Sequence, residues 1–139
     1  MTVMTGKEAL MELLSNNKVK YVFGLPGATE VVFMDALERR PDIKYILGLN
    51  ESVVVAMAEG YARVTGEAGV VNLHTHAGLA AAMGMLDNAY RGRVPLVVTA
   101  GQQPTHLLIQ NPPLSGDMVK MAGPVTKWST EVHSAADIP

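Results

Sequence analysis

Short apolar runs alternate along the chain with segments in which apolar residues recur every third or fourth position. Continuous apolar runs are typical of strands buried on both faces, and the wider spacing is typical of amphipathic helices. Strands that alternate with helices in this way predict an α/β fold, a mostly parallel sheet with helices on both faces. Helices are predicted over residues 5–17, 31–37, 51–65, 78–91 and 117–122, and strands over 19–25, 43–49, 69–73, 95–100 and 125–131.

Two segments depart from this alternation. Residues 101–116 are rich in proline and glycine and are predicted to form a long loop. The last residues resemble the beginning of a helix, with Ser134 as its N-cap and small residues behind it. We therefore expect residues 1–139 to form a single domain that is truncated at its C-terminal end.

Composition narrows the choice of partners. Hydrophobic residues make up 48% of the chain and charged residues 17%, which predicts either that much of the chain is core or that some of its surface is covered by another subunit or domain. The formal net charge of -2 gives no basis for binding nucleic acid or an anionic membrane. The chain has no cysteine and no apolar signal segment at its start. We therefore expect a cytoplasmic protein without disulfides or thiolate metal sites.

Glu51 is the acidic residue with the least expected surroundings. It lies in an apolar stretch that predicts a buried strand running directly into a buried helix. An acid in such a place must be paired, neutralised or used in chemistry. The alternative is structural, because Asn50 is a good N-cap and the helix dipole favours an acid in the first turn.

Polar residues also follow the other predicted strands. In open parallel sheets, ligands bind beyond the carboxyl ends of the strands. His74 and His76 have the spacing of some metal-binding pairs, but no third ligand is evident, and a polar pocket is the preferred interpretation. Neither a Gly-x-Gly-x-x-Gly nor a Walker A motif is present. The residues expected at this edge are Pro26, Gly27, Glu51, His74, His76 and Gln102.

Four segments in this order resemble the N-terminal, pyrimidine-binding domain of thiamine-diphosphate-dependent enzymes. They are residues 24–27 (GLPG), 49–51 (LNE), 72–84 (NLHTHAGLAAAMG) and 95–103 (PLVVTAGQQ). Within the decarboxylase and acetolactate synthase group, the chain is most similar to benzoylformate decarboxylase. The resemblance implies a doubly wound, flavodoxin-like fold over the whole chain.

The resemblance also implies roles for individual residues. The carboxyl group of Glu51 would meet N1′ of the aminopyrimidine ring and favour the tautomer that takes the proton from C2 of the thiazolium. His74 would transfer protons on the substrate side, and Pro26 and Gly27 would lie near the cofactor. The substrate-side candidates are Ala28, Thr75, His76 and Gln102. Benzoylformate decarboxylases usually carry a serine, which helps to hold the substrate carboxylate, where this chain has Ala28.

Part of the family's active site is absent from this sequence. The diphosphate and Mg²⁺ are held by a separate C-terminal domain with a Gly-Asp-Gly…Asn motif, which these residues lack, so no metal site is expected in this chain. The family's site forms between the pyrimidine domain of one subunit and the diphosphate domain of its neighbour. We therefore expect a homodimer or tetramer that acts on a small 2-keto acid, and an inactive chain when it is alone.

Three interpretations remain open. The chain is part of a 2-keto-acid decarboxylase or of a carboligase such as acetolactate synthase. It is the pyrimidine-binding subunit of a split enzyme, as in sulfopyruvate-type decarboxylases. It is a non-catalytic interaction domain on the same fold, because a fold does not determine a function.

Overall fold

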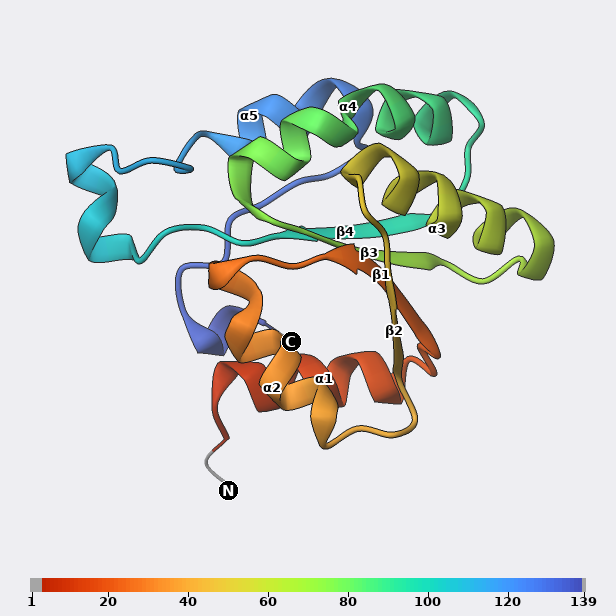
Figure 1. Ribbon diagram of the computed structural model, residues 1–139, viewed down its shortest axis with the longest axis horizontal. Helices are drawn as coiled ribbons and strands as arrows, with labels where there is room; N and C mark the ends of the chain where they lie inside the picture. Colours follow the sequence, from red (N-terminus) through yellow and green to blue (C-terminus); the bar gives the residue numbers. More distant parts are fainter. Residues whose placement is uncertain (1–3, 139) are drawn as a thin grey trace.

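A parallel sheet of four strands forms the centre of the molecule, which the computed structural model describes over residues 4–138 (Figure 1). Residues 1–3 and 139 of the predicted domain lie outside the described residues. The strand order is β2-β1-β3-β4, and every neighbouring pair is parallel. The predicted three-layer α/β fold is confirmed. The strands are β1 (Tyr21–Leu25), β2 (Lys44–Leu47), β3 (Gly69–Leu73) and β4 (Leu96–Ala100).

Helices cover both faces of the sheet (Figure 1). One face packs against α1 and α2 through a core that includes Val22 and Val70, and the other packs against α3, α4 and α5 through a core that includes Phe23 and Val71. Successive residues of β1 and β3 thus point to opposite cores, as strand geometry requires. The helices are α1 (Gly6–Asn16), α2 (Val31–Glu38), α3 (Glu51–Thr65), α4 (Thr75–Arg91) and α5 (Met118–Ala122).

Local signals explain where several helices begin and end. Thr5 and Glu8 form a capping box at the start of α1. Asn50 caps α3 by accepting a hydrogen bond of 2.9 Å from the backbone N–H of Ser52. Gly66 ends α3 in the left-handed conformation, with φ +75°, which glycine adopts without steric cost. The predicted cap at Ser134 exists, but it begins only a short 3₁₀ turn, Ala135–Asp137.

The strand order reverses between β1 and β3. From β1 the chain continues to β2 on one side, and from β2 it crosses back to β3 and then to β4 on the other side. Open α/β sheets bind ligands in the crevice outside the carboxyl ends of the strands at such a switch point. The loops that follow β1 and β3 are therefore the favoured place for a site.

The strand expected over 125–131 is not formed. A 3₁₀ turn, Gly123–Val125, is followed by irregular chain, and the side chain of Trp128 is 75% exposed. The β-branched and aromatic residues of this segment favour a strand only when a neighbouring strand offers pairing. Within the described residues, β4 is paired on one side only, with β3.

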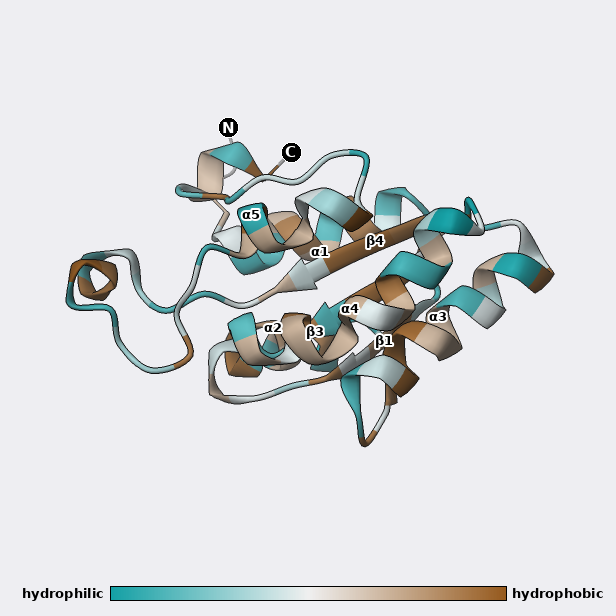
Figure 2. Cartoon of the chain, turned by 90° about the horizontal axis from the view of Figure 1, so that it is seen from above, coloured by the Kyte–Doolittle hydropathy of each residue, from teal (hydrophilic) through white to brown (hydrophobic). Residues whose placement is uncertain are grey.

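Two other expectations need correction. The strand before Glu51 is an edge strand rather than a buried one, with Leu47 58% and Leu49 88% exposed. The predicted loop over 101–116 contains a 3₁₀ helix, Thr105–Gln110, which projects from the body of the molecule (Figure 1). Colouring by hydropathy shows that this projection carries apolar residues (Figure 2). Among the residues described, no helix has the length and apolar character needed to cross a membrane.

Candidate functional site

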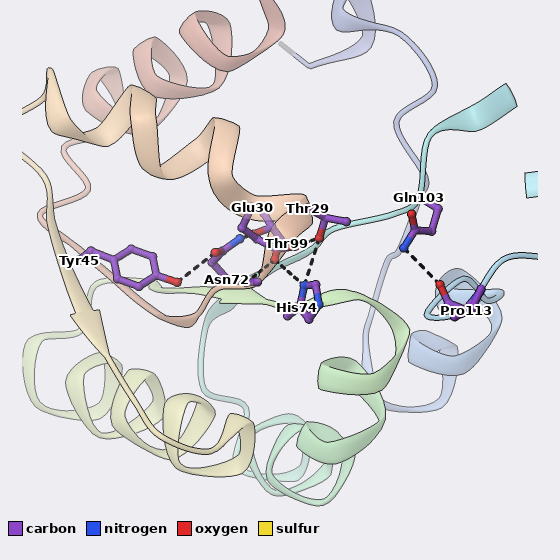
Figure 3. A network of polar contacts seen from close by, with 9 residues as sticks. Thr29, Glu30, Tyr45, Asn72, His74, Thr99, Gln103 and Pro113 are labelled. Carbon is purple, nitrogen blue, oxygen red and sulfur yellow. Dashed lines mark hydrogen bonds and ion pairs between the residues drawn. The ribbon is translucent and has the colours of Figure 1, made fainter. Parts of the chain in front are cut away.

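Glu30 and His74 form the centre of a polar cluster at the switch point (Figure 3). Glu30 ends the 3₁₀ turn after β1, Ala28–Glu30, and His74 directly follows β3. The Nδ1 atom of His74 lies 2.7 Å from Oε2 of Glu30 and 3.2 Å from Oγ1 of Thr29. Oε2 of Glu30 also accepts a hydrogen bond of 2.8 Å from the backbone N–H of Gly27, and Oε1 accepts one from the Thr29 hydroxyl. The Glu30 side chain is 2% exposed.

Two glycines leave the space that this cluster occupies. A Cβ atom at Gly27 would overlap the His74 imidazole. A Cβ atom at Gly101, which follows β4, would overlap the side chains of Thr29 and Glu30. The close approach of three strand ends therefore depends on residues without a side chain.

A second row of polar contacts crosses the sheet beside this cluster (Figure 3). The hydroxyl of Tyr45 on β2 donates to Oδ1 of Asn72 on β3 at 3.1 Å, and Nδ2 of Asn72 donates to Oγ1 of Thr99 on β4 at 3.1 Å. Gly24 on β1 permits this crossing, because a Cβ atom there would overlap the Tyr45 hydroxyl. Burial, together with the negative charge of Glu30, raises the pKa of Tyr45 well above its usual range.

Thr75 is held in an unusual conformation between the two histidines. Its φ of +57° lies in the left-handed region, which is a rare place for a β-branched residue. Its side chain is fully buried, and its hydroxyl has no hydrogen-bond partner among residues 4–138. Thr75 was expected to face a substrate, but it does not reach the surface of the site. Its backbone reverses the chain at the start of α4, three residues earlier than the helix was expected to begin.

An open hollow of about 390 Å³ lies beside His74. It contains two of the predicted substrate-side residues, Ala28 and Gln102, and its size suits a small organic molecule. His76 packs instead against Gly116, where a Cβ atom would overlap its ring. Gln102 ties these segments together, because its Nε2 donates to the Gly116 carbonyl at 3.0 Å. The residues that line the hollow are Ala28, Thr29, His74, Gln102, Gln103, Pro104 and Leu114.

Glu51 begins α3, directly after the Asn50 cap, and its side chain is half-buried. It lies against the first turn of α4, where a Cβ atom at Gly78 would be 3.2 Å from Oε1 of Glu51. In the described part of the chain it forms no ion pair, in contrast to most other acids of the helices. Gly78 therefore has no side chain that would crowd the carboxyl group of Glu51. Glu51 is not among the residues that line the hollow.

Sequence reasoning missed Thr29 and Glu30 as members of the site. Both directly precede α2, where an acid is a common structural feature of a helix start. The burial of Glu30 depends on Gly101 and His74, which lie far away in sequence. A useful signal was present in the order PGATE, in which an acid directly precedes a run of apolar helix residues.

Residues 4–120 match the family described as "Thiamine pyrophosphate enzyme, N-terminal TPP binding domain". The chain is 40% identical over 136 residues to a benzoylformate decarboxylase of Pseudomonas aeruginosa, covering 97% of this chain and 25% of that protein. It is 37% identical over 139 residues to the large subunit of acetolactate synthase isozyme 3 of Escherichia coli, covering all of this chain and 24% of that protein.

The fold agrees with solved structures as well. A thiamine diphosphate-dependent 4-hydroxybenzoylformate decarboxylase of Rhodococcus jostii superposes with a TM-score of 0.93 and is 43% identical, over 98% of this chain and 26% of that one. The chain thus spans about a quarter of the length of these relatives. By its sequence, its fold and the loops at its switch point, the chain belongs to the family of N-terminal TPP-binding domains of thiamine pyrophosphate enzymes.

Proposed function

We propose that the chain is the pyrimidine-binding part of a thiamine-diphosphate-dependent 2-keto-acid decarboxylase of the benzoylformate decarboxylase type. The observation that carries the proposal is the position of Glu51. Its carboxyl group is half-buried at the start of α3, without an ion-pair partner in the described residues, beside the space left by Gly78. An acid that served only to complement the helix dipole would not require a glycine on the neighbouring helix.

Thiamine diphosphate, when bound, supplies an electron sink for the loss of carbon dioxide from a 2-keto acid. Glu51 would hold the proton shared with N1′ of the aminopyrimidine ring and would thereby favour one tautomer of that ring. Pro26 and Gly27 follow β1 at the switch point, where Gly27 packs against the His74 ring, and they would lie near the cofactor. His74 holds or releases a proton on the substrate side, in the hollow next to Ala28 and Gln102.

The chain supplies only part of this site. We propose that a diphosphate-binding domain, from a neighbouring subunit of a homodimer or tetramer, holds the diphosphate group and Mg²⁺ and closes the hollow against water. The exposed apolar residues on α2, α3 and β4 agree with surfaces that other domains or subunits cover; they include Val31, Val32, Val53, Val64 and Val97. We further propose that the assembly works in the cytoplasm and that the chain alone is inactive.

The test uses the longer polypeptide to which we propose that the chain belongs. Carbon dioxide release from benzoylformate is measured with and without thiamine diphosphate, for the wild type, for Glu51→Gln and for Glu38→Gln, a matched change on the exposed face of α2. Loss of general acid–base catalysis lowers kcat by about 100-fold or more in Glu51→Gln, and Glu38→Gln stays close to wild type. Equal rates for Glu51→Gln and the wild type would remove the proposed role.

A carboligase is the second candidate, favoured by the 37% identity to an acetolactate synthase subunit. The two reactions share the loss of carbon dioxide but differ in the final product. Incubation with pyruvate, followed by identification of the product, separates them: acetolactate indicates the carboligase, and an aldehyde indicates the decarboxylase. The reading frame after Pro139 separates both from a split subunit, which has no continuous diphosphate-binding domain.

A further inference from the structure

We propose that Glu30 is a positioning residue that keeps the proton of the His74 imidazole on Nδ1, so that Nε2 is the ring nitrogen presented to the ligand. The inference rests on the proposed function only where it assigns a task to Nε2. The link between Glu30 and His74 itself rests on the contacts in the switch-point cluster, which is defined as Gly27, Thr29, Glu30, His74 and Gly101.

The hydrogen bonds of the cluster determine which atom carries the proton. A carboxylate accepts hydrogen bonds and cannot donate them. The Thr29 hydroxyl has a single proton, which it donates to Oε1 of Glu30. Nδ1 of His74 contacts both Oε2 of Glu30 and Oγ1 of Thr29, and both of these atoms are acceptors in this arrangement. With Glu30 as a carboxylate, the proton between them belongs to Nδ1.

The geometry around Glu30 prevents other arrangements. The carboxyl group is almost fully buried, and its two oxygens are used by Gly27, Thr29 and His74. In the described part of the chain its ion-pair partner is His74, and no arginine or lysine competes for it. The His74 ring lies against Gly27 and the Glu30 carboxyl group lies against Gly101, so a side chain at either glycine would displace them. A buried carboxylate that binds one histidine nitrogen fixes both the ring orientation and its tautomer.

This tautomer has a consequence for the hollow. His74 is one of its lining residues, and its side chain remains 25% exposed. With Nδ1 occupied, Nε2 is the nitrogen that can meet a ligand. A neutral His74 then offers a lone pair at Nε2, and a protonated His74 offers an N–H whose charge Glu30 balances. In the opposite tautomer the lone pair of Nδ1 would face the Glu30 carboxylate, and repulsion between these two acceptors would destabilise it.

The first test needs neither cofactor nor substrate. The 139-residue chain is labelled with ¹⁵N-histidine, and long-range ¹H–¹⁵N spectra are recorded above the pH range in which histidine titrates. The His74 signals, identified by their loss in His74→Asn, should show the proton on Nδ1. Glu30→Gln should mix the two tautomers, because its amide can donate as well as accept. A proton on Nε2 in the wild type, or an unchanged spectrum in Glu30→Gln, would overturn the proposal.

Glu59→Gln is the matched control for this experiment. Glu59 is 5% exposed and is likewise fully bonded, but its partners are Arg63 and Asn88 between α3 and α4. This variant also replaces a buried carboxylate and lowers stability. The His74 spectrum should stay as in the wild type. A change as large as that in Glu30→Gln would mean that the tautomer reports general loosening of the fold, and the proposal would fail.

The second test is a double-mutant cycle in the longer polypeptide with thiamine diphosphate. Glu30→Gln should lower kcat for benzoylformate by about 10- to 100-fold with a small change in KM, the range found for carboxylates that orient metal-bound histidines. In the background of His74→Ala the same change should have no further effect on kcat, because Glu30 acts only through His74. A loss of the same size in both backgrounds would overturn the proposal.

The two tests keep the inference separate from the proposed function. If Glu51→Gln were fully active but the His74 proton lay on Nδ1, the proposed function would fail and the pairing of Glu30 with His74 would stand. If Glu51→Gln were inactive but the tautomer did not depend on Glu30, the proposed function would stand and the inference would fail.

Discussion

Glu30 and Glu59 are two glutamates with almost the same burial but with different kinds of partner. Glu30 is 2% exposed and Glu59 is 5% exposed. Oε1 of Glu59 accepts hydrogen bonds from Nη2 and Nε of Arg63 at 2.7 and 3.0 Å, and the amide of Asn88 reaches both carboxyl oxygens. Glu30 instead binds a hydroxyl, a backbone N–H and an imidazole.

The difference separates a structural acid from one that serves a site. Arg63 and Asn88 only donate hydrogen bonds to Glu59, and the bonds from Asn88 link α3 to α4. The imidazole of His74 has one ring nitrogen that donates and one that accepts, and it borders the hollow. Burial alone would not have distinguished the two acids. The two acids are distinguished by the chemistry of their partners and by the position of Glu30 at the switch point.

The largest effect on stability is expected when a methyl group is forced into the switch-point cluster. In Gly27→Ala the new Cβ atom overlaps the His74 ring, which Glu30 holds in place, so the free energy of unfolding should fall by about 2–3 kcal/mol. Chemical denaturation measures this change. Gly60→Ala is the control on α3, where a Cβ atom meets nothing within 4 Å, and it should instead raise stability by about 0.5–1 kcal/mol. Equal effects at the two positions would contradict the packing described.

Glu59→Gln should lower stability by about 2 kcal/mol, because its amide leaves part of the Arg63 and Asn88 donors unsatisfied. Its kcat in the longer polypeptide should nevertheless remain near the wild-type value. Unfolding curves and steady-state kinetics on the same preparation provide both numbers. A tenfold loss of kcat would show that the acid between α3 and α4 is not purely structural.

Backbone strain should also distinguish Thr75, at the start of α4, from Ala80 in the interior of the same helix. Thr75→Gly and Thr75→Ala both remove the buried hydroxyl, but only glycine adopts φ +57° without a steric penalty. The glycine variant should therefore be more stable than the alanine variant by about 1 kcal/mol. At Ala80, an exposed position inside α4, Ala80→Gly should be destabilising by about the same amount. If alanine were the better residue at both positions, the strain at Thr75 would not exist.

The smallest effect concerns the tyrosine next to Glu30. Because burial raises the pKa of Tyr45, the folded protein keeps this proton at a pH where the unfolded chain has begun to lose it. Stability should therefore fall as pH rises above about 10, the ordinary tyrosine value. Tyr45→Phe should show a shallower fall over this range and a loss of about 0.5–1 kcal/mol at neutral pH, from the hydrogen bond to Asn72. Identical slopes for the two proteins would argue against a buried phenol.

Four of the strands, the helices and their order along the chain were predictable because each depends on local pattern. The cap at Asn50 and the stop at Gly66 are examples, since their chemistry lies within a few residues. The edge character of β2 was not predictable, because an apolar run does not show whether a strand has one neighbour or two. The prediction of a strand over 125–131 was wrong for a similar reason. Its residues favour a strand, but a strand forms only where a neighbouring strand pairs with it, and within the described residues the sheet ends at β4.

The site was predictable in part. His74, Ala28 and Gln102 were expected at one edge of the sheet, and they line one hollow. The role of Glu30 was not visible, because its burial results from two glycines and a histidine that the fold brings together. The left-handed conformation of Thr75 was also not visible, since such a backbone is normally occupied by glycine.

Glu51 is proposed to activate the aminopyrimidine ring of thiamine diphosphate. The most direct measurement is the rate at which the C2 proton of the bound cofactor exchanges with deuterium in the longer polypeptide, without substrate. Glu51→Gln should slow this exchange by about 100-fold or more, and Glu59→Gln should leave it unchanged. Exchange at the wild-type rate in Glu51→Gln would contradict the proposed role of Glu51.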